Sequence, residues 1–378
     1  AYIDELQRSF ELKQNKNLPI FNGGLVGYFG YDCVRYIENK LVDSEPPDQI
    51  GTPDALFMIS HEVAVFDNLH NKLHLILHIQ SHDDEEQANA RLDELEDNLK
   101  TSLPFEDFVK PVKSIEEKDF VSGFGEQEFK NSVQKAKKYI ESGDIMQVVC
   151  SQRMSIPFNA DPVALYRSIR QLNPSPYMYY LNLKEFHIVG SSPEILARLE
   201  DGKITVRPLA GTRRRGKDEE DDMAMQEDMV NDPKEIAEHL MLIDLGRNDV
   251  GRVAKPGTVK VTEKFGIEKY SHVMHMVSNV EADLNEGLSA IDLFKATFPA
   301  GTVSGAPKVR AMEIIDEFEP VKRGIYGGAV GYLSWQGNMD MAIAIRTAVI
   351  KDEVLYIQAG GGWVADSQPD LEWKESLN

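Results

Sequence analysis

Hydrophobic and polar positions alternate over short runs in the first part of the chain, a pattern typical of strands joined by turns. Such runs lie at 23–32, 54–67 and 72–80. A charged segment with helical spacing follows at 85–99. Residues 101–125 carry proline, glycine and charge without a sustained period, so we expect a linker there.

From residue 126 the hydrophobic period becomes regular again. Residues 126–142 predict a helix whose apolar face includes Phe129 and Val133 and which stops at Gly143. The same criteria predict helices at 161–172, 233–245 and 306–318 and strands at 145–157, 177–183, 186–192, 324–335, 339–350 and 353–361. Strands joined by short turns favour antiparallel sheets with helices packed outside, an α+β fold.

Length and composition narrow the class of protein. The 378 residues allow one large or two medium domains, and 42% hydrophobic with 27% charged residues is ordinary for a globular chain. The longest apolar runs are only strand-length, and the polar opening residues do not resemble a leader. Only Cys33 and Cys150 are present, so we expect two reduced thiols and a cytoplasmic location.

The net charge of −21 makes phosphate backbones and anionic lipids poor partners, so we expect neither a nucleic-acid nor a membrane role. An anionic substrate would need local arginines, backbone N–H groups or a bridging metal ion. The segment 207–216, with Arg207 and Arg213–Arg215 around Ala-Gly-Thr, is a candidate anion cradle. A basic surface loop before the acidic run at 218–222 explains its composition equally well.

Two pairs of glutamates stand three residues apart on predicted helices. Glu235 and Glu238 share one helix face behind a capping Asn231 or Asp232, and two such carboxylates suit Mg²⁺. The other pair is Glu372 and Glu375, close to the end of the sequence. In a chain with 62 acidic residues such pairs also arise on ordinary solvated faces, which spacing alone does not distinguish.

Histidine spacing gives a weaker signal. His272 and His275, three residues apart, would fall on opposite faces of a strand, which disfavours a paired metal site. The glycine-rich segment at 300–315 lacks the spacing of a phosphate loop, so nucleotide binding is not supported.

Seven segments taken together resemble the chorismate-utilising enzymes, and among them component I of the anthranilate synthases. In chain order they are GDIMQVVCSQR, GSSPEILAR, RPLAGTRRRG, EIAEHLMLIDLGRNDVGRV, FPAGTVSGAPKVRAMEII, AIAIRTA and GGGWVADSQPDLEWKES. The earlier GGLVGYFGYDCVRYIE resembles the N-terminal domain of the amino-transferring branch. The resemblance implies two face-to-face antiparallel sheets with helices outside, an N-terminal domain at 1–118 that we expect to be incomplete at its start, and a chorismate-binding domain at 119–378.

The resemblance also implies a reaction, in which chorismate and ammonia give anthranilate and pyruvate through an aminodeoxyisochorismate intermediate, the first step of tryptophan synthesis. Ammonia would come from glutamine through a partner glutaminase subunit, component II. In the family Mg²⁺ bridges acidic side chains to the ring carboxylate. The matching positions are Glu238 and Glu375, supported by Glu235 and Glu372.

Further roles follow residue by residue from the resemblance. The enolpyruvyl carboxylate would be held at the positions Arg346, Tyr326, Gly211, Thr212, Gly361 and Gly362. Glu194 matches the general acid at the C4 hydroxyl, and His275 matches a histidine associated with the elimination. Catalytic positions thus comprise Glu194, His275, Gln147 and Thr212.

Two positions bear on the branch of the family. Gln147 stands where water-adding relatives carry a lysine base, and Ala210 where aminodeoxychorismate synthases carry a lysine nucleophile. Both replacements favour anthranilate, although aminodeoxychorismate synthase and a non-catalytic tryptophan-binding subunit remain alternatives.

A feedback pocket for tryptophan is the last expectation from the resemblance. It would involve Asn173, Pro174, Tyr177, Met178, Val330 and Tyr332. The Leu-Leu-Glu-Ser segment that forms the other half of this pocket in the family does not occur in the sequence. The chain also stops before the lysine and final helix expected next, so we expect feedback and full activity to depend on residues beyond those given.

Overall fold

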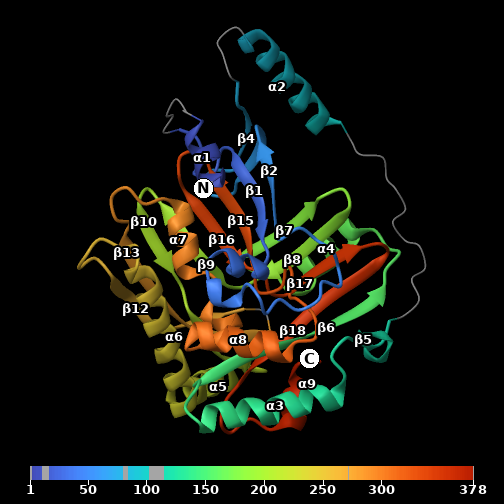
Figure 1. Cartoon of the computed structure of the whole chain (residues 1–378). Coiled ribbons are helices and arrows are strands. Elements are labelled where there is room, and N and C mark those ends of the chain that lie inside the picture. Colours follow the sequence, from blue (N-terminus) through green and yellow to red (C-terminus); the bar gives the residue numbers. More distant parts are fainter. Residues whose placement is uncertain (1, 11–16, 80–83, 102–114, 271, 378) are drawn as a thin grey trace.

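The computed structural model describes residues 2–10, 17–79, 84–101, 115–270 and 272–377 (Figure 1). Its α-helices are α1 (Tyr2–Arg8), α2 (Glu85–Lys100), α3 (Glu126–Glu141), α4 (Pro162–Leu172), α5 (Glu219–Asn231), α6 (Pro233–Gly251), α7 (Ala290–Thr297), α8 (Lys308–Phe318) and α9 (Pro369–Glu375). Short 3₁₀ helices are η1 (Tyr31–Tyr36), η2 (Asn39–Leu41), η4 (Glu117–Asp119) and η5 (Gly301–Val303).

Antiparallel strands make up the centre of the molecule. They are β1 (Gly24–Phe29), β2 (Ala55–Ser60), β3 (Glu62–Asp67), β4 (Lys72–Leu77), β5 (Val121–Ser122), β6 (Gln147–Pro157), β7 (Tyr177–Asn182), β8 (Phe186–Ser192), β9 (Ile195–Glu200), β10 (Lys203–Val206), β11 (Leu209–Arg214), β12 (Lys260–Lys269), β13 (Val273–Asp283), β14 (Gly305–Ala306), β15 (Ala329–Ser334), β16 (Met339–Ile343), β17 (Thr347–Lys351) and β18 (Val354–Trp363).

These strands form two large sheets and a separate hairpin of β3 and β4. The nine-stranded sheet runs β11-β13-β10-β9-β16-β15-β1-β2, with β12 also paired to β13. The seven-stranded sheet runs β14-β6-β18-β17-β8-β7, with β5 also paired to β6. The predicted α+β fold is therefore confirmed. Because β1 and β2 join the same sheet as β9 and β15, the nine-stranded sheet crosses the expected domain boundary at 118, which stays a prediction.

The two sheets pack against each other through one apolar cluster. Tyr28 and Val330 come from the nine-stranded sheet, whereas Leu181, Ile188 and Val349 come from the seven-stranded one, and all five are buried in that cluster. Alternating strands place these side chains on one face and direct the others to the helices. The expected face-to-face arrangement is thus present.

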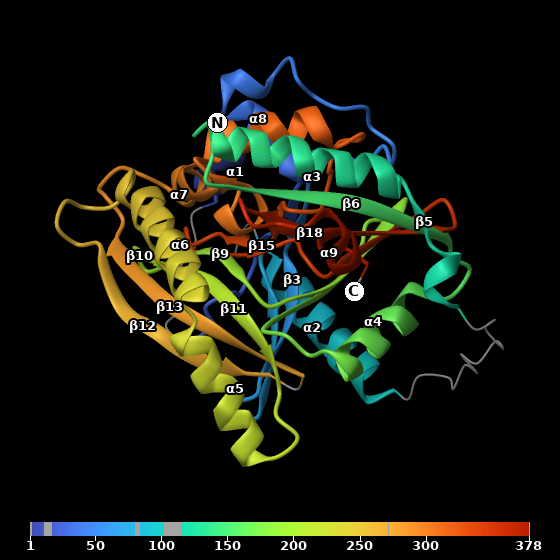
Figure 2. The same cartoon turned by 90° about the horizontal axis from the view of Figure 1, so that it is seen from below.

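Helices cover the outer faces of both sheets (Figures 1 and 2). In Figure 2 α5 and α6 lie along β11–β13, whereas α3 and α8 lie over β6. Local sequence sets where these helices begin. Asp161 and Asp232 each accept a hydrogen bond from the backbone two residues on, directly before a proline in the first turn of α4 and α6. None of the helices formed by the described residues is long and apolar enough to cross a membrane.

Three of the predicted segments differ from the structure. The single strand expected at 54–67 is divided into β2 and β3, and the one at 339–350 into β16 and β17. The acidic run after residue 216 begins α5, which the sequence did not predict because its apolar face is narrow. Residues 102–114 of the expected linker lie outside the described residues. Residues 121 and 122, also expected to belong to the linker, form β5, which pairs with β6.

Candidate active site

Two neighbouring chain crossings between the sheets position Glu194 and Arg346. The first crossing leads from β8 to β9 and contains Glu194, and the second leads from β16 to β17 and contains Arg346. Backbone hydrogen bonds join them, since Ile343 N donates to Glu194 O (3.0 Å) and Ser191 N donates to Arg346 O (3.1 Å). Arg346 has a φ of 49°, a left-handed conformation directly before β17. The crossings therefore bring an acid and a cation together where the sheets meet.

The carboxyl group of Glu194 is buried, with 6% of the residue exposed. Thr302 of η5 donates its hydroxyl to the two carboxyl oxygens at 3.1 and 3.2 Å, and Leu209 contributes a backbone hydrogen bond. Burial outweighs these contacts and raises the pKa of Glu194 to about 8. A carboxyl with this pKa carries its proton at neutral pH, as a general acid requires.

His275 lies on β13 opposite Thr212 of β11. Its Nδ1 is 3.0 Å from Thr212 Oγ1 and 3.2 Å from the carbonyl oxygen of Gly211, which has a φ of 65° beside an irregularity in the strand pairing. Because a carbonyl only accepts, the contact with Gly211 favours a proton on Nδ1 and leaves Nε2 as a proton acceptor.

Two further observations fit a base at His275. Burial lowers the pKa of its imidazole, so the neutral form dominates at neutral pH. Nε2 is buried and has no hydrogen-bond partner within the part of the chain that the structure describes. Arg346 is close enough to lower the imidazole pKa as well, which links His275 to the crossing that carries Glu194.

Helix α6 brings Glu238 next to β6. The adjacent His239 is buried against β13, where its Nε2 lies 2.7 Å from Ser278 Oγ, and this contact fixes the rotation of α6. Gln147 at the start of β6 then donates to Glu238 Oε1 (3.3 Å). A Cβ atom on Gly362 of β18 would lie 2.1 Å from Gln147 Nε2, so only glycine leaves room for this amide.

The second pair of glutamates borders the same strand. A Cβ atom on Gly361 would lie 3.5 Å from Glu372 Oε2 and 3.7 Å from Glu375 Oε1. Burial and then the charge of Glu375 raise the pKa of Glu372, while Lys234 opposes the effect from the first turn of α6. Glu372 and Glu375 of α9 thus border Gly361, whereas Glu238 of α6 is linked to the neighbouring Gly362 only through Gln147.

Oxygen donors of this kind fit Mg²⁺. Glu235 is already engaged, because Arg213 Nη1 lies 2.7 Å from its Oε1, so direct coordination by Glu235 would require that ion pair to open. Among the described residues no three histidine, cysteine, aspartate or glutamate side chains are arranged as a ready metal cluster. The Mg²⁺ assignment of Glu235, Glu238, Glu372 and Glu375 therefore stays a prediction.

The arginine segment does not form the open cradle or the surface loop considered from the sequence. Most of it is strand β11, and its arginines form ion pairs, with Arg213 bound to Asp228, Arg214 to Asp221 and Arg215 to Asp222. They clamp α5 onto β11. Arg346 remains the cation of the site: it is exposed, and Glu194 and Tyr270 are the ionisable groups that act on it.

Tyr326 is buried, with 8% exposed, in the connection before β15. Arg323 lies over its ring at 5.5 Å from the centroid. Burial raises the pKa of Tyr326 to about 12, so the phenol keeps its proton and can donate a hydrogen bond. Its role at the substrate carboxylate stays a prediction.

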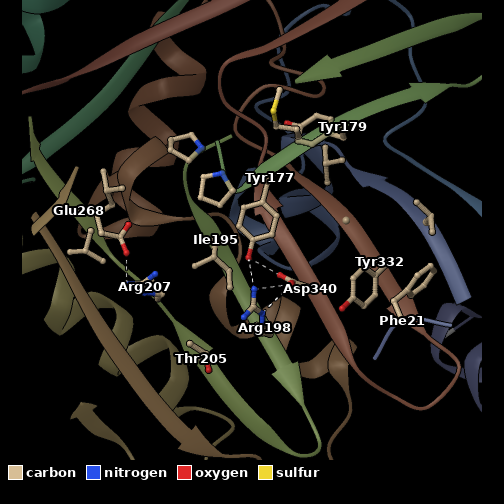
Figure 3. Close-up of a pocket in the computed structure, with 18 of the residues that line it drawn as sticks. Phe21, Tyr177, Tyr179, Ile195, Arg198, Thr205, Arg207, Glu268, Tyr332 and Asp340 are labelled. Atoms are coloured by element: carbon tan, nitrogen blue, oxygen red, sulfur yellow. Dashed lines mark hydrogen bonds and ion pairs between the residues drawn. The ribbon is translucent and has the colours of Figure 1, made fainter. Parts of the chain in front are cut away.

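A cavity of about 520 Å³ lies between the sheets beside these residues (Figure 3). Tyr177, Met178, Val330 and Tyr332, four of the six expected tryptophan-pocket residues, line it. Asn173 and Pro174 are not among its lining residues. Asn173 instead ends α4, where its carbonyl accepts the Ser191 hydroxyl.

Among the polar side chains of this cavity, the sequence singled out Tyr177, Tyr332 and Arg207 but not Arg198, Glu268 or Asp340. Arg198 and Tyr177 both bind Asp340, at 3.0 and 2.8 Å, and Arg207 binds Glu268 at 2.7 Å (Figure 3). Four of these residues come from four different strands, β7, β9, β12 and β16, and Arg207 lies between β10 and β11, so only the folded sheets bring the five together. The one available signal was a charged residue within an otherwise apolar strand, as at Asp340.

Comparisons with known proteins agree over the whole chain. A family model described as chorismate binding enzyme matches residues 2–378. Anthranilate synthase component 1 of Pseudomonas aeruginosa is 57% identical, with 100% of this chain and 77% of that protein covered. The protein of the same name from Aquifex aeolicus is 51% identical, with 100% and 76% covered.

Solved structures give the same result. The crystal structure of anthranilate synthase component I from Streptococcus pneumoniae matches with a TM-score of 0.91 and 39% identity, covering 100% of this chain and 83% of that one. A putative isochorismate synthase from Bacillus anthracis, at 20% identity and a TM-score of 0.68, shares the fold. The chain belongs to the chorismate binding enzyme family, within which it is similar throughout to anthranilate synthase component 1.

Proposed function

We propose that this chain converts chorismate and ammonia to anthranilate, pyruvate and water, the first step of tryptophan synthesis. The observation that carries the proposal is that an acid, a base and a cation lie together where the sheets meet. The charge of Arg346 acts on both Glu194 and His275. His275 Nδ1 lies 3.2 Å from the carbonyl oxygen of Gly211, the glycine that Glu235 borders, and Glu238 accepts a hydrogen bond from Gln147. A substrate with two carboxylates and a leaving hydroxyl needs an acid, a base, a cation and a carboxylate cluster side by side.

The first step requires a proton on the departing C4 oxygen, because hydroxide is a poor leaving group. Ammonia forms a bond to C2, both ring double bonds shift by one position, to C1=C6 and C4=C5, and the C4–O bond breaks, while the added nitrogen gives its extra proton to solvent. The proton of Glu194 makes the departing group water. Burial supports this role since it holds the pKa of Glu194 at about 8.

The second step removes the C2 proton and breaks the ether bond to the enolpyruvyl arm, so that the ring becomes aromatic. His275 Nε2 accepts the C2 proton, and the released enol becomes pyruvate. Thr212 and the carbonyl of Gly211 hold the opposite nitrogen, which sets the tautomer. Arg346 and Tyr326 would bind the enolpyruvyl carboxylate, for which a guanidinium fork is suited.

A bound Mg²⁺ would neutralise the ring carboxylate, and Glu238 and Glu375 are the residues that would hold it, supported by Glu235 and Glu372. Without such a cation the substrate would meet several negative side chains. The chemical type of these side chains supports the ion, because Mg²⁺ prefers carboxylate oxygens, and calorimetric Mg²⁺ binding would test it apart from turnover.

Two replacements favour ammonia and anthranilate over the other products of the family. Gln147 donates its amide to Glu238, and an amide cannot deprotonate water. Ala210 is an apolar residue of β11 and cannot form a covalent adduct. Aminodeoxychorismate synthase remains the rival that product identification separates.

Regulation and partners extend the proposal. The cavity lined by Tyr177, Met178, Val330 and Tyr332 would bind tryptophan as a feedback inhibitor. A separate glutaminase subunit would deliver ammonia. This chain and that subunit would act in the cytoplasm. Co-purification with such a subunit, and glutamine-dependent turnover on mixing, would test the partner.

Product identification tests the main proposal. Chorismate, ammonium and Mg²⁺ are incubated with the chain, and the products are resolved by chromatography with fluorescence detection. We expect anthranilate and pyruvate in equal amounts. Isochorismate, aminodeoxychorismate or no turnover would contradict the proposal.

A further inference from the structure

Arg323 is a buried cation near the site, and no motif of the sequence points to it. Its exposed fraction is 2%, and its guanidinium donates in three directions. Nη1 binds the carbonyl of Val303 (2.5 Å), Nη2 binds the carbonyl of Val149 (2.7 Å), and Nε and Nη2 bind the carboxylate of Glu319 (2.9 and 2.6 Å). Burying a charge is costly unless it is paired in this way, so the arrangement is over-determined.

Glu319 is equally buried and completes the cluster. Its Oε1 also accepts hydrogen bonds from the backbone N–H (2.8 Å) and hydroxyl (2.9 Å) of Ser151. Gln358 of β18 donates to the same hydroxyl at 2.8 Å. The ion pair therefore joins the end of α8, strand β6 and strand β18.

Three contacts of Arg323, with Val303, Val149 and Tyr326, lead to proposed functional residues. Val303 follows Thr302, which binds the carboxyl of Glu194. Val149 lies two residues beyond Gln147, the partner of Glu238, on the same strand. The guanidinium also lies over the rings of Tyr31 and Tyr326, at 4.6 and 5.5 Å.

We infer that Arg323, held by Glu319, is a positioning residue that sets the placement of Thr302, Gln147 and Tyr326 relative to one another. The inference rests on the proposed function, because it concerns the geometry of that same site. Arg323 touches no proposed substrate atom and acts through the segments that it holds.

A guanidinium is required because its fixed planar fork reaches two carbonyls and a carboxylate at once. Lysine keeps the charge but offers one compact ammonium on a flexible stem, which cannot hold the carbonyls of Val149 and Val303 together. Arg323→Lys should therefore preserve the ion pair with Glu319 and loosen η5. When η5 moves, Thr302 loses its hold on Glu194, and the hydroxyl contact that favours the ionised carboxyl is weakened.

The test compares Arg323→Lys with Arg35→Lys. Arg35 is also a buried arginine, with 9% exposed, and it forms a bidentate pair with Asp316 and a hydrogen bond to the carbonyl of Leu41. Its partners Asp32, Leu41 and Asp316 include none of the residues that Arg323 is proposed to place, namely Thr302, Gln147 and Tyr326. For each variant, unfolding by heat is recorded together with kcat, KM and the pH dependence of kcat in anthranilate formation.

We expect a folded Arg323→Lys variant with kcat lower by about 10- to 100-fold, as small displacements in active sites produce. The pH at which kcat of Arg323→Lys declines on the alkaline side should be higher than in the wild type. Arg35→Lys should keep the wild-type position of this alkaline limb and a kcat within about twofold of the wild type. A purely structural role would lower the active fraction without moving the limb. Equal profiles for the two folded variants would overturn the inference.

If Arg323→Lys does not fold, Ser151→Ala decides, because it removes only one hydroxyl contact to Glu319 and one to Gln358. A lower kcat with the limb moved to higher pH then supports the inference, and an unchanged profile overturns it. An inactive wild-type chain would contradict the proposed function instead, so the two failures are distinguishable.

Discussion

The hydroxyl of Thr302 lies within 3.2 Å of both carboxyl oxygens of Glu194, and the two residues stand 108 positions apart in the sequence. The contact joins η5, which precedes α8, to the crossing between β8 and β9. Burial of Glu194 raises the pKa of its carboxyl to about 8, although the Thr302 hydroxyl acts in the opposite direction. The first predictions follow from this single carboxyl group.

Activity should fall at alkaline pH. Glu194 must be protonated to act, so kcat should decline as the pH rises through about 8, the pKa of its carboxyl.

Glu194→Ala should lower kcat by about 10²–10⁴-fold, the usual contribution of a general acid. Rates across a pH series check both points. A variant that keeps the wild-type rate would remove Glu194 from the chemistry.

Stability should also depend on pH through Glu194. Between the ordinary carboxyl pKa of 4.5 and about 8, the folded chain keeps a proton that the unfolded chain releases, so this group makes stability fall as pH rises over that window. Glu194→Gln has no such proton, and its Tm relative to the wild type should increase from about pH 5 to about pH 8. Glu86→Gln on the exposed surface of α2 is the control. A Tm difference that is constant with pH would contradict the raised pKa.

His275→Met should separate the two chemical steps. Methionine fills similar space but accepts no proton at neutral pH, so the amino intermediate should accumulate while anthranilate falls. Chromatography of the products over time measures both species. Unchanged anthranilate yield would refute the role of His275 as the base, and loss of both products would point to a defect before the elimination.

The cavity in Figure 3 should bind tryptophan through Tyr332 and its neighbours. Tyr332→Ala removes an aromatic wall, which should weaken inhibition by about tenfold or more while kcat stays within about twofold. Inhibition curves for the wild type and the variant provide the measurement, with Tyr166→Ala on α4 as the control. Equal inhibition of all three chains would place the inhibitor elsewhere.

Much of the fold was predictable because its helices and strands have clear periods. The helices at 85–99, 126–142 and 161–172 are each confirmed within a few residues as α2, α3 and α4. The division of residues 339–350 was not predictable, because the segment has no proline or glycine to mark a turn where the chain passes from one sheet to the other near Arg346. Only the pairing of β16 with β9 and of β17 with β8 reveals the crossing.

The candidate site was predictable in its residues and not in its arrangement. Resemblance supplied Glu194, His275 and Arg346, whose spacing carries no geometric signal. The engagement of Glu235 by Arg213 and the buried contacts of Arg323 were not foreseen, since both depend on strands and helices far apart in sequence. Ion pairs that form only after the sheets assemble leave no local pattern.

The central claim is that carboxylates of α6 and α9 act together with a divalent ion on chorismate. The most direct measurement is the Mg²⁺ dependence of anthranilate formation, with Mg²⁺ binding by calorimetry, in the wild type and in Glu238→Gln. The account predicts saturable Mg²⁺ activation in the wild type, and neither tight binding nor turnover in a Glu238→Gln chain that keeps its Tm. Wild-type rates without Mg²⁺, or an unchanged Mg²⁺ response in Glu238→Gln, would contradict it.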